Sequence, residues 1–168
     1  MARTGLQRIW ARILLTGLTA AVMALIFFFS MEPAEKSDRT SGQVSMTVIN
    51  VLHPDYNTYT KEKKESLFGN VQHLVRKTAH FTEYMILGVL LRLCFESWFG
   101  KKRFLAPGSW AAGTLYACTD ELHQRIIDGR SGQFTDVLID SSGVLIGVLL
   151  AVLVLKAVRK KGRGKACP

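Results

Sequence analysis

The chain has 168 residues, of which 48% are hydrophobic and 21% are charged, and its formal net charge is +9. The apolar residues gather in four runs long enough for a helix to cross a hydrocarbon core about 30 Å thick, and the basic residues flank these runs. This distribution is typical of membrane orientation by positive flanks and argues against nucleic-acid binding, so we predict one membrane domain, residues 1–168.

The first apolar run covers residues 13–30 and follows a basic N-terminal segment. A cleaved signal peptide is the alternative interpretation. Its apolar region is usually shorter, about 7 to 15 residues, and an A-x-A-like cleavage site follows it. Since no such site follows residue 30, we predict a retained membrane span.

The segment of residues 31–77 is polar and contains the turn signal "HPDYN". Two weak amphipathic patterns lie within it, one around Val44 to Leu52 and one around Leu67 to Val75. We therefore expect a long extracytoplasmic loop that carries short helices on the membrane surface.

Three further spans are expected at residues 79–99, 104–124 and 134–155, and residues 156–168 form a basic tail. Placing both termini and the basic residues 101–103 in the cytoplasm satisfies every charged flank at once. The sequence thus predicts an all-α integral membrane four-helix bundle with N-in/C-in topology, which brings the long loop and the turn near residue 130 to the outer side.

Polar residues recur at helical spacing near the outer ends of three of these spans. Lys77, His80, Glu83 and Tyr84 follow steps of three and four, and so do Asp136 and Asp140. A carboxylate at the centre of a span costs about 2.5 to 3.5 kcal/mol, so such groups usually face the bundle interior and mark function. We predict that they line an outward-facing cavity with these ligand-binding candidates: Lys77, His80, Glu83, Tyr84, Asp120, Glu121, Gln124, Arg130, Asp136 and Asp140.

The segments "KTAHFTEYMILGVLL", "DELHQRIIDGRSGQFTDVLID" and "SSGVLIG" resemble, in this order, the motifs of the VanZ-like membrane proteins. The resemblance implies a four-span protein of the bacterial cytoplasmic (inner) membrane. For the founding member it implies low-level resistance to the glycopeptide teicoplanin without enzymes that remodel peptidoglycan precursors. Asp140 departs from the family pattern because many relatives carry Asn there, and an acid makes the expected cavity more anionic.

These observations leave three functions open. The first is an envelope protein whose cavity binds a lipid or lipid-linked cell-wall headgroup, with Arg130, Arg125 and Lys77 holding an acidic group. The second is an intramembrane enzyme acting on a lipid-linked or phosphorylated substrate, with His80, Glu83, Asp120 and Glu121 as catalytic candidates, in which Asp136 and Asp140 contribute acids or oxygen ligands for a divalent cation. The third is a transporter of small solutes or protons.

A purely structural role is also possible for the buried polar residues, which would then only join the helices by hydrogen bonds. The three cysteines are too few and too scattered for a disulfide framework or a metal-ligand pattern, so we predict no metal site, and the sequence assigns neither a cofactor nor an oligomeric state. The expected partners are membrane lipids or a lipid-linked envelope precursor.

Overall fold

The computed structural model describes residues 5–126 and 133–164, and these residues form helices and no strands. The elements are α1 (Gly5–Ser30), α2 (Ala34–Leu52), a short 3-10 helix η1 (Tyr56–Thr58), α3 (Lys61–Phe99), α4 (Leu105–Gln124) and α5 (Phe134–Gly164). The all-α prediction is therefore confirmed.

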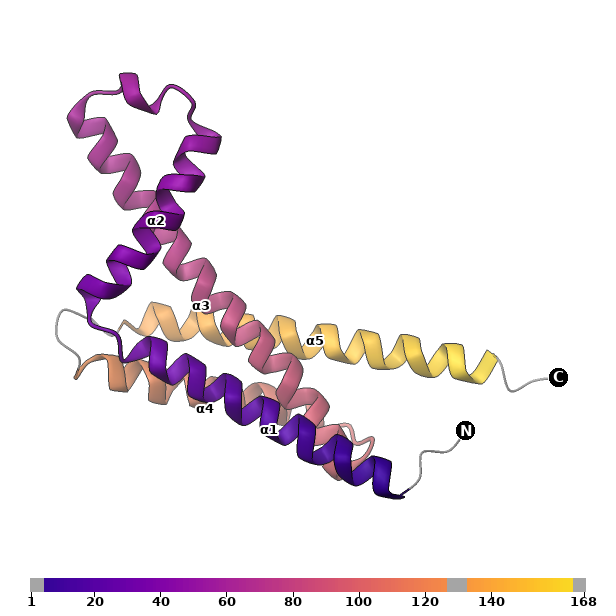
Figure 1. The fold of residues 1–168 in the computed structure, drawn as a ribbon. Helices are drawn as coiled ribbons and strands as arrows, with labels where there is room; N and C mark the ends of the chain where they lie inside the picture. Colours follow the sequence, from indigo (N-terminus) through magenta and orange to yellow (C-terminus); the bar gives the residue numbers. More distant parts are fainter. Residues whose placement is uncertain (1–4, 127–132, 165–168) are drawn as a thin grey trace.

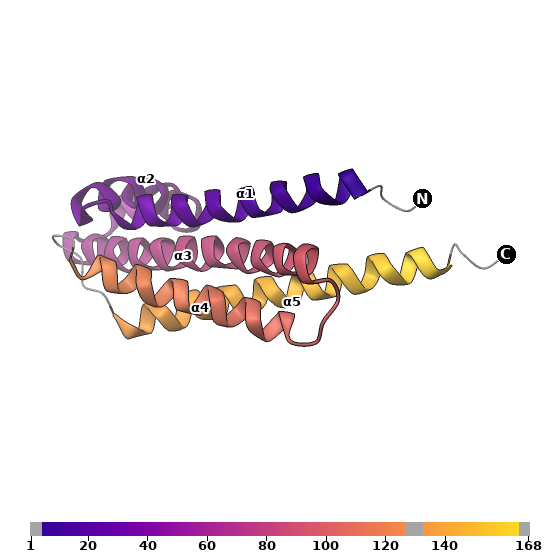
Figure 2. The same cartoon turned by 90° about the horizontal axis from the view of Figure 1, so that it is seen from below.

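α3 is the central helix of the fold. It contacts all four of the other α-helices, most extensively α5. In Figure 2 it lies between α1 on one side and the pair α4 and α5 on the other. The buried apolar core joins the four long helices through these residues: Ile26, Tyr84, Leu87, Leu91, Ala117, Val144 and Val148.

The helix that contains the second predicted span is much longer than expected. α3 begins at Lys61 rather than near residue 79, and its 39 residues extend for about 58 Å at 1.5 Å per residue. No proline interrupts the chain between Lys61 and Phe99, and a polar composition alone does not end a helix. α3 finally stops at Gly100, which has the positive φ of 70° that glycine adopts without strain.

The expected long loop is instead mostly a helical hairpin made of α2 and the first part of α3, which projects away from the bundle (Figure 1). Gln72 donates a hydrogen bond to the carbonyl oxygen of Asp38 at 2.9 Å, and Arg76 forms an ion pair with the Asp38 carboxylate at 2.7 Å. Ser45 and Ile49 are fully buried on the inner face of α2. The amphipathic patterns thus belong to two helices that pack on one another.

The C-terminal helix also exceeds its predicted span. α5 continues beyond residue 155 to Gly164, so most of the expected basic tail is helical. Lysine and arginine are good helix formers, and their charge ends a membrane span without ending the helix.

α3 and α5 approach one another closely through glycines. A Cβ added to Gly143 or Gly147 would overlap the carbonyl oxygen of Phe81 or Met85 on α3, and a Cβ on Gly88 would overlap the carbonyl oxygen of Val144 on α5. Small residues at such spacing are the usual basis of tight helix pairs in membranes. This contact fixes the register of α3 and α5, the two helices that carry most of the predicted ligand-binding residues.

Two described helices are long and apolar enough to cross a membrane, namely Gly5–Ser30 and Phe134–Lys161. α3 and α4 do not meet this criterion. Glu83, Arg92 and Glu96 lie within the apolar part of α3, and Asp120 and Glu121 lie near the end of α4. The helical architecture of the predicted bundle is therefore confirmed, two of its helices are candidate membrane spans, and the four-span arrangement stays a prediction.

Candidate functional site

The polar residues of α3, α4 and α5 meet at one end of the bundle. This end lies next to the α1–α2 connection, opposite the end that holds the start of α1 and the last turns of α5 (Figure 1). We call the group the polar cluster, and its members are Ser30, Lys77, His80, Glu83, Tyr84, Asp120, Glu121, Gln124, Asp136 and Asp140.

An ion pair joins α3 and α5 at the rim of the polar cluster. Lys77 contacts the carboxylate of Asp136, and each side chain retains about a fifth of its accessible surface. Beneath this pair lies a cavity of ≈ 10 Å³, which has room for about one water molecule. It is lined by Lys77, His80, Glu121, Asp136, Ile139 and Asp140. The cavity is much smaller than a site that would enclose a whole headgroup.

Asp120 joins α4 to the end of α1. Ser30 donates its hydroxyl hydrogen to Asp120 Oδ2 at 2.7 Å, and Gln124 donates to Ser30 Oγ at 3.1 Å and to the same carboxylate oxygen at 3.4 Å. All three side chains are buried. This part of the polar cluster therefore does hold helices together, as the structural interpretation predicts.

Glu121 connects α4 to the start of α5. Its Oε1 accepts a hydrogen bond from the backbone N–H of Gln133 at 2.6 Å, one residue before α5 begins. Since the first N–H groups of a helix lack partners within the helix, a carboxylate here stabilises the N-terminus of α5. Glu121 thus positions the helix that carries Asp136 and Asp140.

Asp140 and Tyr84 form the deepest part of the polar cluster. Asp140 is 2% exposed, and its Oδ1 has no hydrogen-bond partner within the described part of the chain. Tyr84 is fully buried, and its hydroxyl lies close to the carboxyl groups of Asp120 and Asp140. One acceptor oxygen of Asp140 is therefore not used by any described residue at the deepest part of the cluster.

The polar cluster is rich in acids. Glu83, which is partly exposed, lies within electrostatic range of Asp120, and Asp140 interacts with Asp120, Glu121 and Asp136. Among the described residues of the cluster there are thus five carboxyl groups, one lysine and one histidine. These residues therefore include more acidic groups, which accept hydrogen bonds, than cationic groups.

The structure brings nine of the ten predicted ligand-binding residues together, and the tenth, Arg130, lies outside the described residues. Arg125, the other proposed counter-ion, is exposed at the end of α4. Lys77 is therefore the described cation that pairs with an acid of the polar cluster. The role of the ten predicted residues in binding a ligand stays a prediction. Catalysis by His80, Glu83, Asp120 and Glu121 also stays a prediction.

Sequence reasoning missed Ser30, whose hydroxyl reaches Asp120 across 90 positions of the chain. Its sequence signal is weak because it is only a serine that ends an apolar run. The structure also adds Tyr116, which donates to the carbonyl oxygen of Met23 at 2.6 Å and so ties α4 to α1. Among the residues that the structure describes, no group of three His, Cys, Asp or Glu side chains is arranged to hold a metal ion.

Comparison with known proteins supports the resemblance seen in the motifs. Neither a curated protein nor a solved structure matches the chain significantly. The sequence model of the VanZ/LLP1 family matches residues 15–155, which include α2, α3, α4 and most of α1 and α5. This match covers the polar cluster and well over half of the chain, and the chain therefore belongs to the VanZ/LLP1 family.

Proposed function

We propose that this chain is a four-span protein of the bacterial inner membrane whose polar cluster binds the headgroup of a lipid or lipid-linked cell-wall precursor. We further propose that this binding alters susceptibility to glycopeptide antibiotics of the teicoplanin type. The family match, the two strongly apolar helices and the many exposed apolar side chains support a membrane location.

The arrangement of charged residues supports the outward orientation of the polar cluster. The basic residues 101–103 and the basic turns of α5 lie at the end that also holds the start of α1, and the polar cluster lies at the opposite end. By the positive-inside rule, the basic end faces the cytoplasm. The polar residues of α3 and α4 then face the interior of the bundle, where charged side chains of a membrane span are tolerated.

The observation that carries the proposal is the unpartnered carboxyl oxygen of Asp140 beside the small cavity. A buried polar atom without a partner costs free energy, and most such atoms in proteins are paired. Asp120 Oδ1 also lacks a partner among the described residues, but Asp120 does not line the cavity, and its Oδ2 already accepts two hydrogen bonds. Asp140 is thus the acid best placed to receive a donor from outside the chain.

The composition and size of the cavity define the part of the ligand that it accepts. Among the described residues that line the cavity, acids outnumber cations, and Lys77 is already paired with Asp136. This composition favours a hydrogen-bond donor over a phosphate. A volume of ≈ 10 Å³ admits one small group, such as an ammonium or a sugar hydroxyl. We therefore propose that a terminal amine or hydroxyl of the headgroup enters the cavity and that the remainder lies outside it.

An antibiotic susceptibility assay tests this function. The chain is expressed with an epitope tag in a teicoplanin-susceptible bacterium, and the inhibitory concentration is compared for wild type, Asp140→Asn, Asp140→Leu and the control Glu65→Gln. Glu65 is an exposed acid of the hairpin, far from the polar cluster. Wild type and Glu65→Gln are expected to raise the inhibitory concentration. Asp140→Asn is expected to raise it less, because its amide keeps one acceptor oxygen. Asp140→Leu is expected not to raise it.

Protein abundance in the membrane, measured by immunoblot, serves as the control for folding. Full protection by Asp140→Leu at wild-type abundance would contradict the role of the polar cluster. Absence of protection by wild type would contradict the link to glycopeptides.

A further inference from the structure

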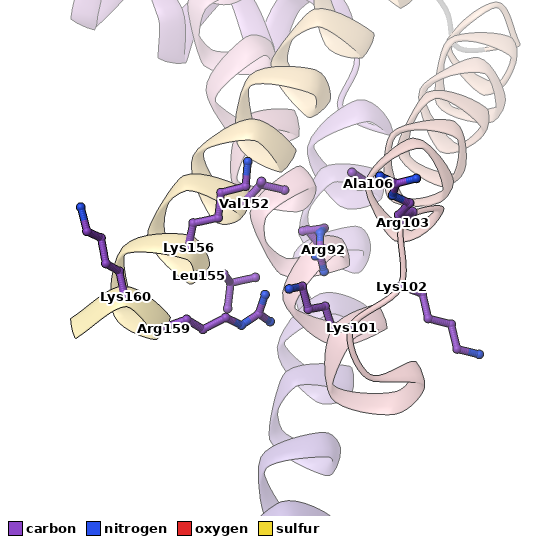
Figure 3. Close-up of a pocket in the computed structure, with 10 residues that line it drawn as sticks. All are labelled: Arg92, Lys101, Lys102, Arg103, Ala106, Val152, Leu155, Lys156, Arg159 and Lys160. Atoms are coloured by element: carbon purple, nitrogen blue, oxygen red, sulfur yellow. The ribbon is translucent and has the colours of Figure 1, made fainter. Parts of the chain in front are cut away.

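A second and much larger cavity lies at the opposite end of the bundle, where α3, α4 and α5 meet the connection between α3 and α4 (Figure 3). Its volume is ≈ 750 Å³, which is within the range of about 300 to 1,000 Å³ typical of small-molecule sites. We call it the basic pocket because seven of its ten lining residues are lysine or arginine.

These cations come from three separate parts of the chain. Lys101, Lys102 and Arg103 belong to the α3–α4 connection, and Lys156, Arg159 and Lys160 belong to the last turns of α5. In Figure 3 the three α5 cations lie on one side of Arg92, Lys102 and Arg103 lie on the other, and Lys101 is seen just below it. The fold therefore brings these residues together around one cavity. Their positions in the sequence indicate only that they flank membrane spans.

The charge of the basic pocket is not balanced by acids. None of its lining residues within the described part of the chain is acidic. The neighbouring Glu96 forms ion pairs with Arg92 and with Arg159. Subtracting this one carboxylate from the seven cations leaves six positive charges around one cavity, so the pocket favours an anion.

Arg92 provides a buried anchor for such an anion. It is 5% exposed, and its Nη2 lies 2.6 Å from Glu96 Oε2, whereas its Nε and Nη1 have no hydrogen-bond partner among the described residues. A buried guanidinium with unused donors is costly. The fork of an arginine matches two oxygens of a phosphate group and binds them through charge-assisted hydrogen bonds.

Apolar residues complete the wall of the basic pocket and indicate the source of the anion. Ala106, Val152 and Leu155 line the cavity. Leu153 and Val154, in the same turn of α5 but on other faces of it, are about 60% exposed, so apolar surface open to hydrocarbon chains lies at the level of the pocket. A ligand with a phosphate group and attached hydrocarbon chains fits both parts, whereas a soluble phosphate would use only the cations.

We propose that the basic pocket binds the phosphate headgroup of an anionic phospholipid of the cytoplasmic leaflet, with Arg92 as the buried anchor. Basic pockets between membrane helices on this side commonly recognise such headgroups. The proposal is independent of the headgroup proposed for the polar cluster, because the two sites lie at opposite ends of the bundle.

Lipid retention by the full chain tests this proposal. Wild type, Arg92→Gln, the double variant Lys101→Gln/Lys156→Gln and the control Arg8→Gln are reconstituted in vesicles of phosphatidylcholine with or without phosphatidylglycerol. Arg8 is a matched control because it is an exposed cation near the same end that does not line the basic pocket. Bound lipid is then quantified by native mass spectrometry.

Wild type and Arg8→Gln are expected to retain phosphatidylglycerol, and Arg92→Gln is expected to weaken this retention about tenfold, which corresponds to ~1.4 kcal/mol. The double variant removes two exposed lysines and tests the same pocket if Arg92→Gln does not fold. It too is expected to retain less of this lipid than Arg8→Gln.

Two results would overturn the proposal. One is equal retention of phosphatidylglycerol by Arg8→Gln and by every folded pocket variant. The other is displacement of the lipid by inorganic phosphate or pyrophosphate at equimolar concentration, which would assign the pocket to a soluble phosphate.

Discussion

Ser30, the last residue of α1, donates a hydrogen bond of 2.7 Å to Asp120 near the end of α4. The first helix is otherwise largely exposed and makes few contacts with α4. Together with the hydrogen bonds from Gln124 to Ser30 and from Tyr116 to Met23, this contact helps to position α1 against the polar cluster. It also leaves Asp120 Oδ1 as the unpaired oxygen of that carboxylate within the described part of the chain.

Ser30→Ala is expected to lower the free energy of unfolding in detergent by about 1 kcal/mol, because interhelical hydrogen bonds in membrane proteins are worth roughly 0.6 to 1.7 kcal/mol. Ser142→Ala is the matched control, since Ser142 is exposed and donates a hydrogen bond to the carbonyl oxygen of Ile139 in its own helix. Equal unfolding free energies for the two variants would show that the Ser30 contact does not stabilise the bundle.

Gly147→Ala is expected to destabilise the bundle by about 1 to 3 kcal/mol, the usual cost of overpacking. Its Cβ would overlap the backbone of Met85, which cannot move aside as a flexible side chain can. The control is Gly17→Ala in α1, where nothing lies within 4 Å of the added Cβ. Alanine favours a helix more than glycine does, so the control should unfold at the same or a higher denaturant concentration. If Gly17→Ala lost stability while Gly147→Ala did not, the result would contradict the close α3–α5 contact.

The four-span topology predicts which residues are accessible from outside the cell. In a chain whose cysteines are replaced by alanine, Ser66→Cys in the hairpin should react with a membrane-impermeant maleimide in intact cells. Lys102→Cys in the α3–α4 connection should react only after permeabilisation. Both positions are exposed in the structure. Labelling of Lys102→Cys in intact cells would contradict the N-in/C-in arrangement.

Helical periodicity predicted much of the polar cluster. Residues three or four positions apart share a face of a helix, so Lys77, His80 and Tyr84, as well as Asp136 and Asp140, were expected to point in common directions. The cost of burying acids in a membrane then indicated that these faces meet inside the bundle. The structure brings them together as this reasoning requires.

The pairing of particular residues could not be predicted in the same way, because one sequence does not show which helices are neighbours. The Ser30–Asp120 contact, the basic pocket and the packing of α2 on α3 all join segments that are far apart in the chain. The start of α3 at Lys61 differs from the prediction for another reason: polar residues before an apolar span are typical of a loop, whereas here they continue the same helix.

Native mass spectrometry of the chain extracted with its lipids tests the central claim most directly, because it identifies what the polar cluster holds. Wild type and Arg92→Gln are predicted to retain a lipid or lipid-linked precursor that carries an amine or sugar headgroup, whereas Asp140→Leu is predicted to lose it. Arg92→Gln separates this ligand from one bound in the basic pocket. Identical bound lipids in wild type and in folded Asp140→Leu would contradict a ligand site at the polar cluster.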